Sequence, residues 1–242
     1  MLRYYYMDIS SGCSFEQSQL LSGILPKDRI EKKDRYRDYG MAQRSMVTSA
    51  FMQYGIADAL DIPITRIGYC YGPQGKPLLG EESKQYLLDQ GKTGDVYFNL
   101  SHSGKHAVFV VSDEPVGIDV ECGKKQRLKV AKRCFCVEEY EDIISAGSEE
   151  EQDERFLLYW TMKEAFIKRD GRGMSIPLNS FCICRRENEL SYVIDEERKE
   201  RLHFRNFYPE KRCCVSICGK ELISFDVTIV TIEDIIHKMR EE

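Results

Sequence analysis

The stretch from residue 96 to residue 121, VYFNLSHSGKHAVFVVSDEPVGIDVE, decides the fold of this chain. Its apolar residues fall into three short runs, at 96–100, 106–112 and 116–121. These runs are rich in the β-branched and aromatic residues that pack well on a pleated sheet. The turn-forming residues at 101–104 and 113–115 separate the runs. The stretch therefore predicts three consecutive β-strands.

The remaining pattern predicts helices on both sides of these strands and more strands after them. The predicted helices cover residues 15–25, 27–55, 128–134, 137–146, 154–168 and 233–240. The additional strands are predicted at 180–185, 191–194, 202–208, 213–218 and 222–232. Because helices and strands cluster rather than alternate, we expect an α+β fold with antiparallel-rich sheets. The turn at 113–115 divides the chain into two predicted subdomains, 1–113 and 114–242.

Composition excludes several classes of protein. The chain has 242 residues, 42% of them hydrophobic, and a formal net charge of −5. This excludes a disordered chain and a coiled coil. The apolar runs are too short for a membrane helix, and the N-terminus lacks the apolar core of a signal peptide. We therefore expect a cytoplasmic protein that does not bind membranes. Because its net charge is negative, we also expect it not to bind nucleic acid.

Ten cysteines are present, and none forms the C-x-x-C spacing that is typical of half a zinc site. We predict that they are reduced, structural thiols. A metal cluster and a regulatory disulfide are the alternatives. The pairs Cys134/Cys136 and Cys182/Cys184 are two residues apart, which on a strand would place both thiols on one face.

Positive charge gathers in two tracts, residues 27–37 and residues 124–133, each with six bases. A solvated helix face explains either tract taken alone. Together, on an acidic protein, they indicate local affinity for phosphate or for an acidic partner.

Two carboxylates lie close together on the third strand of the opening stretch. Asp119 and Glu121 are two residues apart, so their side chains point to the same face. Gly117 would allow another backbone to come close. Like charges side by side need a cation between them, and Mg²⁺ prefers oxygen ligands. The alternative is a pair of solvent-facing acids on an edge strand.

A second group of polar residues lies in the predicted helix 154–168. Trp160, Glu164 and Lys168 are spaced four apart and share one helical stripe, with Lys163 beside it. A surface ion pair between Glu164 and Lys168 is one interpretation, and it would stabilise little. The single Trp of the chain, one turn before Glu164, favours a partly buried site that uses phosphate and metal.

These segments occur in an order that resembles a known enzyme family. The order is Gly75-Lys76-Pro77, then residues 99–104 (NLSHSG), residues 117–121 (GIDVE), residues 135–139 (FCVEE) and residues 160–168 (WTMKEAFIK). The series is similar to the 4′-phosphopantetheinyl transferases of the Sfp type. The likeness runs from about residue 29 to residue 177.

The resemblance implies an activity and an architecture. Such enzymes, the holo-[acyl-carrier-protein] synthases, transfer the phosphopantetheine arm of coenzyme A to a serine hydroxyl of an apo acyl or peptidyl carrier protein. They release adenosine 3′,5′-bisphosphate and require Mg²⁺. The implied fold is a monomer of two similar α+β subdomains, related by a pseudo-twofold axis, with the active site in the cleft between them. The first subdomain would bind the nucleotide of coenzyme A, and the second would hold the metal and the catalytic carboxylates.

The resemblance also implies residue roles. It assigns Mg²⁺ to Asp119, Glu121 and Glu164, with the pyrophosphate of coenzyme A bound beside Asp119. The groups implied to bind coenzyme A elsewhere are Arg29, Lys32, Arg44, Ser45, Gly75, Lys76, Pro77, Ser101, His102, Lys163 and Lys168. The catalytic groups it implies are Glu164, Glu139, Lys168 and His102. Either Glu164 could take the serine proton directly or Glu139 could take it through water. A carboxylate bound to Mg²⁺ is the poorer base, which favours Glu139, but both alternatives stay open.

Two other functions remain open. A metal-dependent phosphohydrolase would use the same carboxylates with water as nucleophile, but it would not explain the 101–103 segment or the lysines on the nucleotide side. A relative without catalysis would bind carrier proteins or coenzyme A only. The presence of all the carboxylates and of Lys168 and His102 argues against such a relative.

Overall fold

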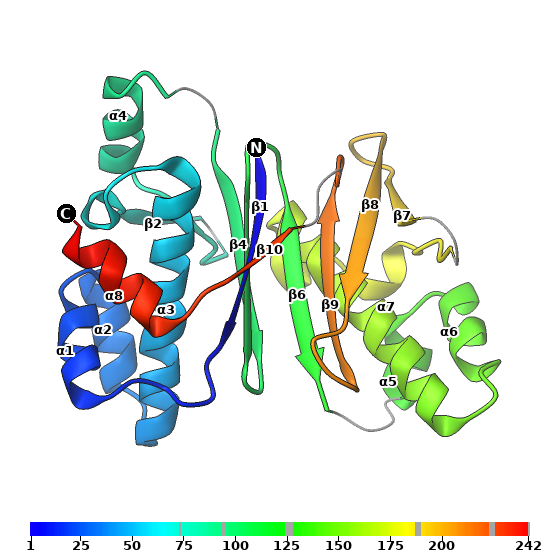
Figure 1. Ribbon diagram of the computed structural model, residues 1–242. Helices are drawn as coiled ribbons and strands as arrows, with labels where there is room; N and C mark the ends of the chain where they lie inside the picture. The colour runs from blue at the N-terminus through cyan, green and yellow to red at the C-terminus, as the bar shows by residue number, and fades with distance from the viewer. Residues whose placement is uncertain (73, 93–94, 124–127, 187–189, 223–225, 242) are drawn as a thin grey trace. The chain divides into compact units, whose positions relative to one another are not determined.

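The computed structural model describes residues 1–72, 74–92, 95–123, 128–186, 190–222 and 226–241 (Figure 1). Within these ranges the side chains of Lys32, Asp34 and Met174 are not described. The chain forms two compact units. Unit 1 comprises Met1–Asp113 together with Asp226–Glu242, and unit 2 is Glu114–Phe225. Each unit contains a four-stranded sheet, so the expected α+β fold class is confirmed.

The sheet of unit 1 has the strand order β10-β1-β5-β4. Its strands are β1 (Leu2–Asp8), β4 (Tyr97–Ser103), β5 (His106–Ser112) and β10 (Val227–Ile229). The central strand β5 is antiparallel to both of its neighbours, β1 and β4, and every residue of it is buried. A separate hairpin, β2 (Tyr69–Tyr71) with β3 (Pro77–Leu79), completes the strands described in this unit.

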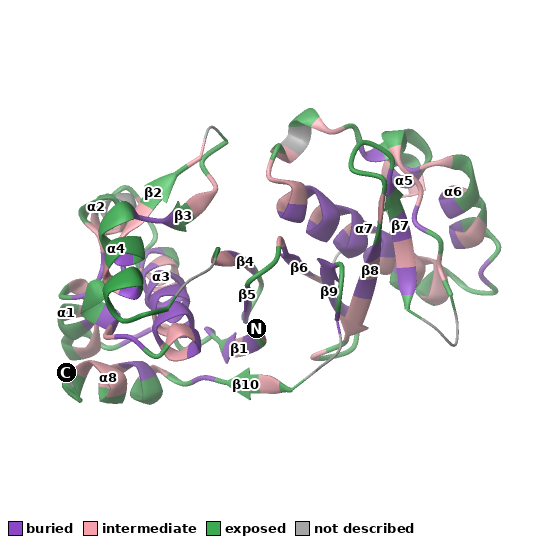
Figure 2. Cartoon of the chain, turned by 90° about the horizontal axis from the view of Figure 1, so that it is seen from above, coloured by how far each residue is buried: buried purple, intermediate pink, exposed green. Residues whose placement is uncertain are grey.

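The helices of unit 1 are α1 (Phe15–Ser22), α2 (Lys27–Asp34), α3 (Tyr39–Leu60), α4 (Glu81–Asp89) and α8 (Ile232–Arg240), with a short 3₁₀ helix, η1, at Ile64–Arg66. The prediction of one helix over residues 27–55 is wrong. The chain breaks between α2 and α3, where Asp38 is extended and its carboxylate caps the backbone N–H of Met41. Helix α3 is buried along most of its length (Figure 2) and packs against β5.

The sheet of unit 2 is antiparallel throughout, with the order β6-β9-β8-β7. Its strands are β6 (Gly117–Cys122), β7 (Ser191–Asp195), β8 (Glu200–Phe207) and β9 (Cys213–Gly219). The helices are α5 (Leu128–Cys134), α6 (Val137–Ile144) and α7 (Glu149–Asp170), followed by the 3₁₀ helices η2 (Gly173–Ser175) and η3 (Leu178–Ser180). Helix α7 packs against both β6 and β9 and forms the centre of the core of unit 2.

Two predicted boundaries differ from the structure for local reasons. The predicted turn at residues 101–104 is mostly strand, because β4 pairs with β5 as far as Ser103 and the tight turn falls at Gly104, whose φ is +59°. Helix α7 begins at Glu149 rather than at 154, because the Ser148 side chain caps the N–H of Glu151. Glu149, Glu150 and Glu151 thus lie in the first turn of the helix, where negative charge is favourable.

The C-terminal segment lies with unit 1, whereas the sequence division continued the second subdomain to residue 242. Strand β10 adds to β1 in parallel, and the two lie side by side in Figure 1. Helix α8 buries Ile235 in the core of unit 1. The pseudo-twofold relation between the halves stays a prediction. Among the described residues, no helix is both long and apolar enough to cross a lipid bilayer.

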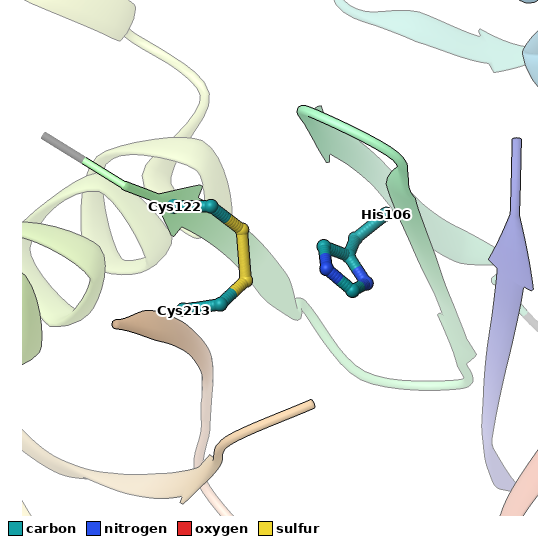
Figure 3. A group of neighbouring side chains, drawn as sticks. All are labelled: His106, Cys122 and Cys213. Carbon is teal, nitrogen blue, oxygen red and sulfur yellow. A yellow bond between two sulfur atoms is a disulfide. The ribbon is translucent and has the colours of Figure 1, made fainter. Parts of the chain in front are cut away.

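The prediction that all ten cysteines are reduced is wrong for four of them. Cys122 and Cys213 form a disulfide between β6 and β9, where they are directly paired in register (Figure 3). Cys136 and Cys182 form a second disulfide. Cys134 ends α5, as the predicted helix 128–134 requires, whereas the predicted strand 180–185 is wrong, because Cys184 makes an isolated bridge to Tyr192 there.

Helix α7 approaches β6 so closely that only a glycine fits at position 117. A β-carbon on Gly117 would lie 2.0 Å from the carbonyl oxygen of Ala165 and 2.5 Å from the backbone nitrogen of Arg169. Such distances are well inside van der Waals contact. The close approach anticipated from the sequence is therefore present, and it brings the backbone of α7 directly onto β6.

We expect Gly117→Ala to unfold or displace α7, since the added methyl group collides with backbone that cannot rotate away. The free energy of unfolding should fall by about 3 kcal/mol or more. Urea denaturation followed by circular dichroism measures this. Gly147→Ala is the matched control in unit 2, because its nearest neighbour would lie 3.7 Å away. Equal stability of the two variants would contradict the close packing described here.

Candidate active site

The carboxylates of β6 point toward α7. Asp119 is directly opposite Ser216, and Glu121 is directly opposite Cys214, on β9. The side chains of paired residues lie on the same face of a sheet. Because Ser216 contacts the Thr161 hydroxyl of α7 at 2.7 Å, this face is the one that α7 covers.

The structure brings the strand motif and the helix motif together. The Nζ atom of Lys168 donates a hydrogen bond to Oδ1 of Asp119 at 2.7 Å. Asp119 is largely buried and Lys168 is partly exposed. The ring of Trp160, one stripe position before Glu164, stacks on Phe156 with a centroid distance of 5.8 Å. The helical stripe is therefore anchored in the core at its Trp160 end and reaches the β6 carboxylates at its Lys168 end.

Glu164 lies in an environment that disfavours its charge. Burial raises the pKa of the Glu164 carboxyl above its usual range, and the negative charge of Asp119 raises it further. Lys168 acts in the opposite direction, while Glu121 adds another increase. Two further carboxylates thus act on Glu164 and Lys168 opposes them, an arrangement in which an added cation would be stabilised.

These carboxylates fit a hard divalent cation by their chemistry. All three offer oxygen ligands, and Mg²⁺ binds proteins through one to a few carboxylates together with substrate phosphates and water. A cation held in this way shares its ligands between the protein and the substrate.

Lys163 and Glu139 form a buried ion pair. Lys163 is 0% exposed and Glu139 is 1% exposed, and 2.9 Å separates Nζ from Oε2. Lys163 also donates to the carbonyl oxygens of Leu178 and Phe181, each at 2.7 Å. An ammonium group has three protons, so its donors are fully used. A phosphate would have to displace one of these partners to reach Lys163.

The Glu139 carboxylate is held on both oxygens. Oε1 accepts from the backbone N–H of Ile183 at 2.8 Å, and Oε2 accepts from the N–H of Cys136 at 3.1 Å. Burial raises the pKa of Glu139, and Lys163 and the two N–H groups oppose that rise. Burial likewise lowers the pKa of Lys163, which Glu139 opposes. Glu139 could take a proton from a substrate only after one of these contacts opened.

In unit 1 the structure joins α2 to the β2–β3 hairpin. The hydroxyl of Tyr71 donates to the Asp28 carboxylate, and the Arg29 guanidinium lies over the Tyr71 ring at 5.6 Å. The backbone N–H of Gly72 donates to the carbonyl of Lys76, which closes the hairpin turn, and Gly75 within it has a φ of +73°. Arg29 and the segment 75–77 are therefore neighbours.

The other predicted nucleotide residues lie on adjacent elements of unit 1. Arg44 and Ser45 are on α3, which packs against α2. Ser101 is buried on β4, and His102, the next residue, is exposed. The Lys32 side chain falls outside the described residues.

Sequence reasoning missed Tyr71 and a polar chain in unit 2. In that chain the Thr161 hydroxyl meets Ser216 at 2.7 Å, and Ser216 donates to Oδ1 of Asn206 at 2.7 Å. The chain links α7 to β9 and β8 next to Asp119. A signal existed in the sequence for Ser216, because it interrupts an otherwise apolar strand.

We expect Lys163→Met to destabilise the protein, because it leaves the buried charge of Glu139 without the ammonium group that neutralises it. The free energy of unfolding should fall by about 3–5 kcal/mol, and Glu139→Gln in the same chain should restore part of it. Thermal melting measures both changes. Lys168→Met is the control, since its partly exposed ammonium group supports Asp119 and contributes little to the core. An unchanged melting temperature in Lys163→Met with a raised KM for coenzyme A would instead make Lys163 a phosphate ligand.

Comparison with known proteins gives a consistent result. Residues 115–218 match the family described as the 4′-phosphopantetheinyl transferase superfamily. The chain is 27% identical over 237 residues to 4′-phosphopantetheinyl transferase Sfp of Bacillus subtilis, covering 97% of this chain and 100% of that protein. It is 32% identical over 166 residues to 4′-phosphopantetheinyl transferase psf-1 of Bacillus pumilus, covering 69% and 66% of the two chains. It is also 27% identical over 205 residues to the L-aminoadipate-semialdehyde dehydrogenase-phosphopantetheinyl transferase of Mus musculus, covering 74% and 63%.

Proposed function

The chain belongs to the 4′-phosphopantetheinyl transferase superfamily, and from that premise we propose that it transfers the 4′-phosphopantetheine arm of coenzyme A to a serine hydroxyl of an apo carrier protein. Adenosine 3′,5′-bisphosphate would be released. The observation that carries the proposal is the contact of Lys168 with Asp119 beside Glu164, inside the residues that match the family.

We assign a bound Mg²⁺ to the carboxylates Asp119, Glu121 and Glu164. The ion would neutralise the negative charge that develops on the pyrophosphate as the serine oxygen attacks. Lys168 supports this arrangement by holding Asp119, and it offers a positive charge to the departing phosphate. Lys163 is assigned to the internal pair with Glu139, on the strength of its three filled donor positions.

Proton removal from the serine is assigned to Glu164, although binding of Mg²⁺ would make it the weaker base of the two, because Glu139 is closed to the substrate. Both oxygens of Glu139 accept hydrogen bonds within a core that excludes solvent, so a substrate hydroxyl cannot approach it. Glu164 is only partly buried and lies among the acidic groups that face Lys168. Glu139 then positions α7 through Lys163, the residue that directly precedes Glu164.

Binding of coenzyme A is assigned to the residues of unit 1. Arg29 and Lys32 would bind the 3′-phosphate, and the hairpin residues 75–77 would lie along the nucleotide. Arg44, Ser45, Ser101 and His102 complete the assignment to the nucleotide and its phosphates. The support for Arg29 is its place beside the hairpin, with its guanidinium held over Tyr71.

Carrier binding is assigned to the exposed basic residues of α5. Lys129, Lys132 and Arg133 are exposed on this short helix, and the rest of the basic tract, 124–127, lies outside the described residues. Positive charge would speed the approach of an acidic carrier. The proposed enzyme acts as a monomer.

The direct test is intact-protein mass spectrometry of an apo carrier protein after incubation with coenzyme A, Mg²⁺ and this protein. We expect a mass gain of one phosphopantetheine group that disappears with EDTA or with a Ser→Ala carrier. No gain across acyl, peptidyl and polyketide carriers, with coenzyme A still bound, would leave a protein that binds without turnover. Release of inorganic phosphate without carrier would indicate the hydrolase instead.

Asp119→Asn should lower kcat by about 100-fold or more, because it removes one negatively charged ligand and the charge that pairs with Lys168. The fold should persist, since the side chain keeps its size. The transfer assay and a thermal melt measure the two effects. Glu154→Gln, an exposed acid on α7, is the control and should keep wild-type activity. Wild-type turnover in Asp119→Asn would remove the metal assignment.

Arg29→Ala should raise the KM for coenzyme A about tenfold or more, the value of a charge-assisted hydrogen bond, at unchanged kcat. The KM for dephospho-coenzyme A should stay unchanged in this variant, because this substrate lacks the 3′-phosphate. Lys32→Ala should behave in the same way. Arg35→Ala is the control from the same basic tract, since its side chain is exposed and forms a loose ion pair with Glu31 at 3.9 Å. Equal losses with both substrates would contradict the 3′-phosphate assignment.

A further inference from the structure

The disulfide between Cys136 and Cys182 joins two segments that are 46 residues apart in the chain. Cys136 is the N-cap residue of α6, and Cys182 follows η3. Between them lie α6 and the whole of α7, including the stripe that carries Glu164 and Lys168. One covalent bond therefore closes the loop that contains the helical half of the proposed site.

The same bond lies directly beside the Glu139 carboxylate. One backbone donor to Glu139 is the N–H of Cys136, and the other is the N–H of Ile183, the neighbour of Cys182. The disulfide thus joins the two segments whose backbone N–H groups donate hydrogen bonds to the two oxygens of Glu139. Separation of these segments would remove at least one donor from a buried charge.

Lys163 passes this restraint on to α7. Its Nζ atom binds Glu139 Oε2 and the carbonyls of Leu178 and Phe181, and it lies over the Phe181 ring at 4.2 Å. Its contacts therefore lie on α6 and on the segment 178–181, close to the two ends of the disulfide. Because Lys163 directly precedes Glu164, the position of Glu164 depends on this set of contacts.

The two disulfides differ in their surroundings. Cys213 is 1% exposed, so the sulfur pair between β6 and β9 is shielded on that side. At the other pair, the Sγ atom of Cys182 lies 3.4 Å from Oε2 of the exposed Glu138. Cys136 and Cys182 are both only partly buried and lie outside the sheet, so a reductant in solution can approach this second pair without unfolding the sheet.

We propose that Cys136 and Cys182 form a thiol–disulfide exchange site, through which a dithiol reductant lowers the activity of the Glu164 site. A thiolate of the reductant attacks one sulfur, the S–S bond breaks, and a mixed disulfide forms. The second thiol of the reductant displaces the remaining cysteine. Two protons and two electrons pass to the protein, which gains two thiols, while the dithiol becomes a disulfide. The effect on rate rests on the proposed transferase function, whereas the exchange itself does not.

Reduction would loosen the contacts of Glu139 without removing any side chain. The segment 178–183 would then be held to α6 by hydrogen bonds and the ion pair alone. Water that reaches the pair weakens it, since the attraction between charges falls as the local dielectric rises. Because Lys163 directly precedes Glu164, greater motion of Lys163 increases the motion of Glu164, and the proposed reaction slows. Binding of coenzyme A, which is assigned to unit 1, stays unchanged.

The test combines three measurements on the oxidised protein with and without dithiothreitol. Alkylation followed by peptide mass spectrometry identifies which cysteines become reactive, and we expect Cys136 and Cys182 to appear only after reduction. The melting temperature should fall by about 5 °C or more on reduction. The transfer assay should show kcat lowered about fivefold at unchanged KM for coenzyme A, with recovery on reoxidation.

The double variant Cys136→Ser/Cys182→Ser should behave like the reduced wild type and should not respond to dithiothreitol. Cys184→Ser, an exposed neighbour outside either disulfide, should keep the full response. Alkylation of Cys136 and Cys182 without reductant would overturn the proposal, as would an equal response of wild type and double variant. If no form transfers phosphopantetheine, the proposed function fails, and alkylation and melting still decide the exchange site.

Discussion

The contact of the α7 backbone with β6 at Gly117 is the constraint on which unit 2 depends. No side chain separates the two elements there, so the carbonyl of Ala165 lies where a β-carbon would otherwise be. This sets how far Lys168 stands from Asp119, and it orients the stripe that carries Glu164. Unit 1 also has a glycine at a close contact between a helix and the sheet, but there the glycine lies on the helix. A β-carbon on Gly55 of α3 would lie 2.5 Å from the Phe109 ring of β5.

Charge in unit 2 is divided between two environments a short distance apart. Lys163 and Glu139 form a closed pair in which every donor and both acceptor oxygens have protein partners. Asp119 binds Lys168, and the charges of Asp119, Glu121 and Lys168 all act on the partly buried Glu164. A buried pair that is complete within the protein holds the elements in position, whereas partly buried carboxylates near one another are suited to binding a cation. The adjacent residues Lys163 and Glu164 thus have different tasks because a helix turns about 100° between them.

Most elements were predictable where local pattern and tertiary environment agree. Helix α5 and strands β5 and β7 lie at or within a residue of their expected places, since their apolar residues have a clear period and turn residues flank them. The break before α3 was missed, because the capping role of Asp38 shows only when the chain on both sides is placed. The segment 180–185 looked like a strand and instead carries Cys182 and Ile183 to α6, where their contacts with Cys136 and Glu139 replace a ladder.

The sequence by itself determined the family, the α+β class and the set of candidate residues, because their types, order and spacing are readable along the chain. It also determined that Asp119 and Glu121 share a face and that Trp160, Glu164 and Lys168 share a stripe, since these follow from the periods of a strand and a helix. Tertiary structure alone decided that Lys163 turns inward to Glu139 and that Arg29 lies over Tyr71. It likewise decided which cysteines meet. Those contacts join residues distant in the chain, and only packing of the elements brings their atoms within bonding distance.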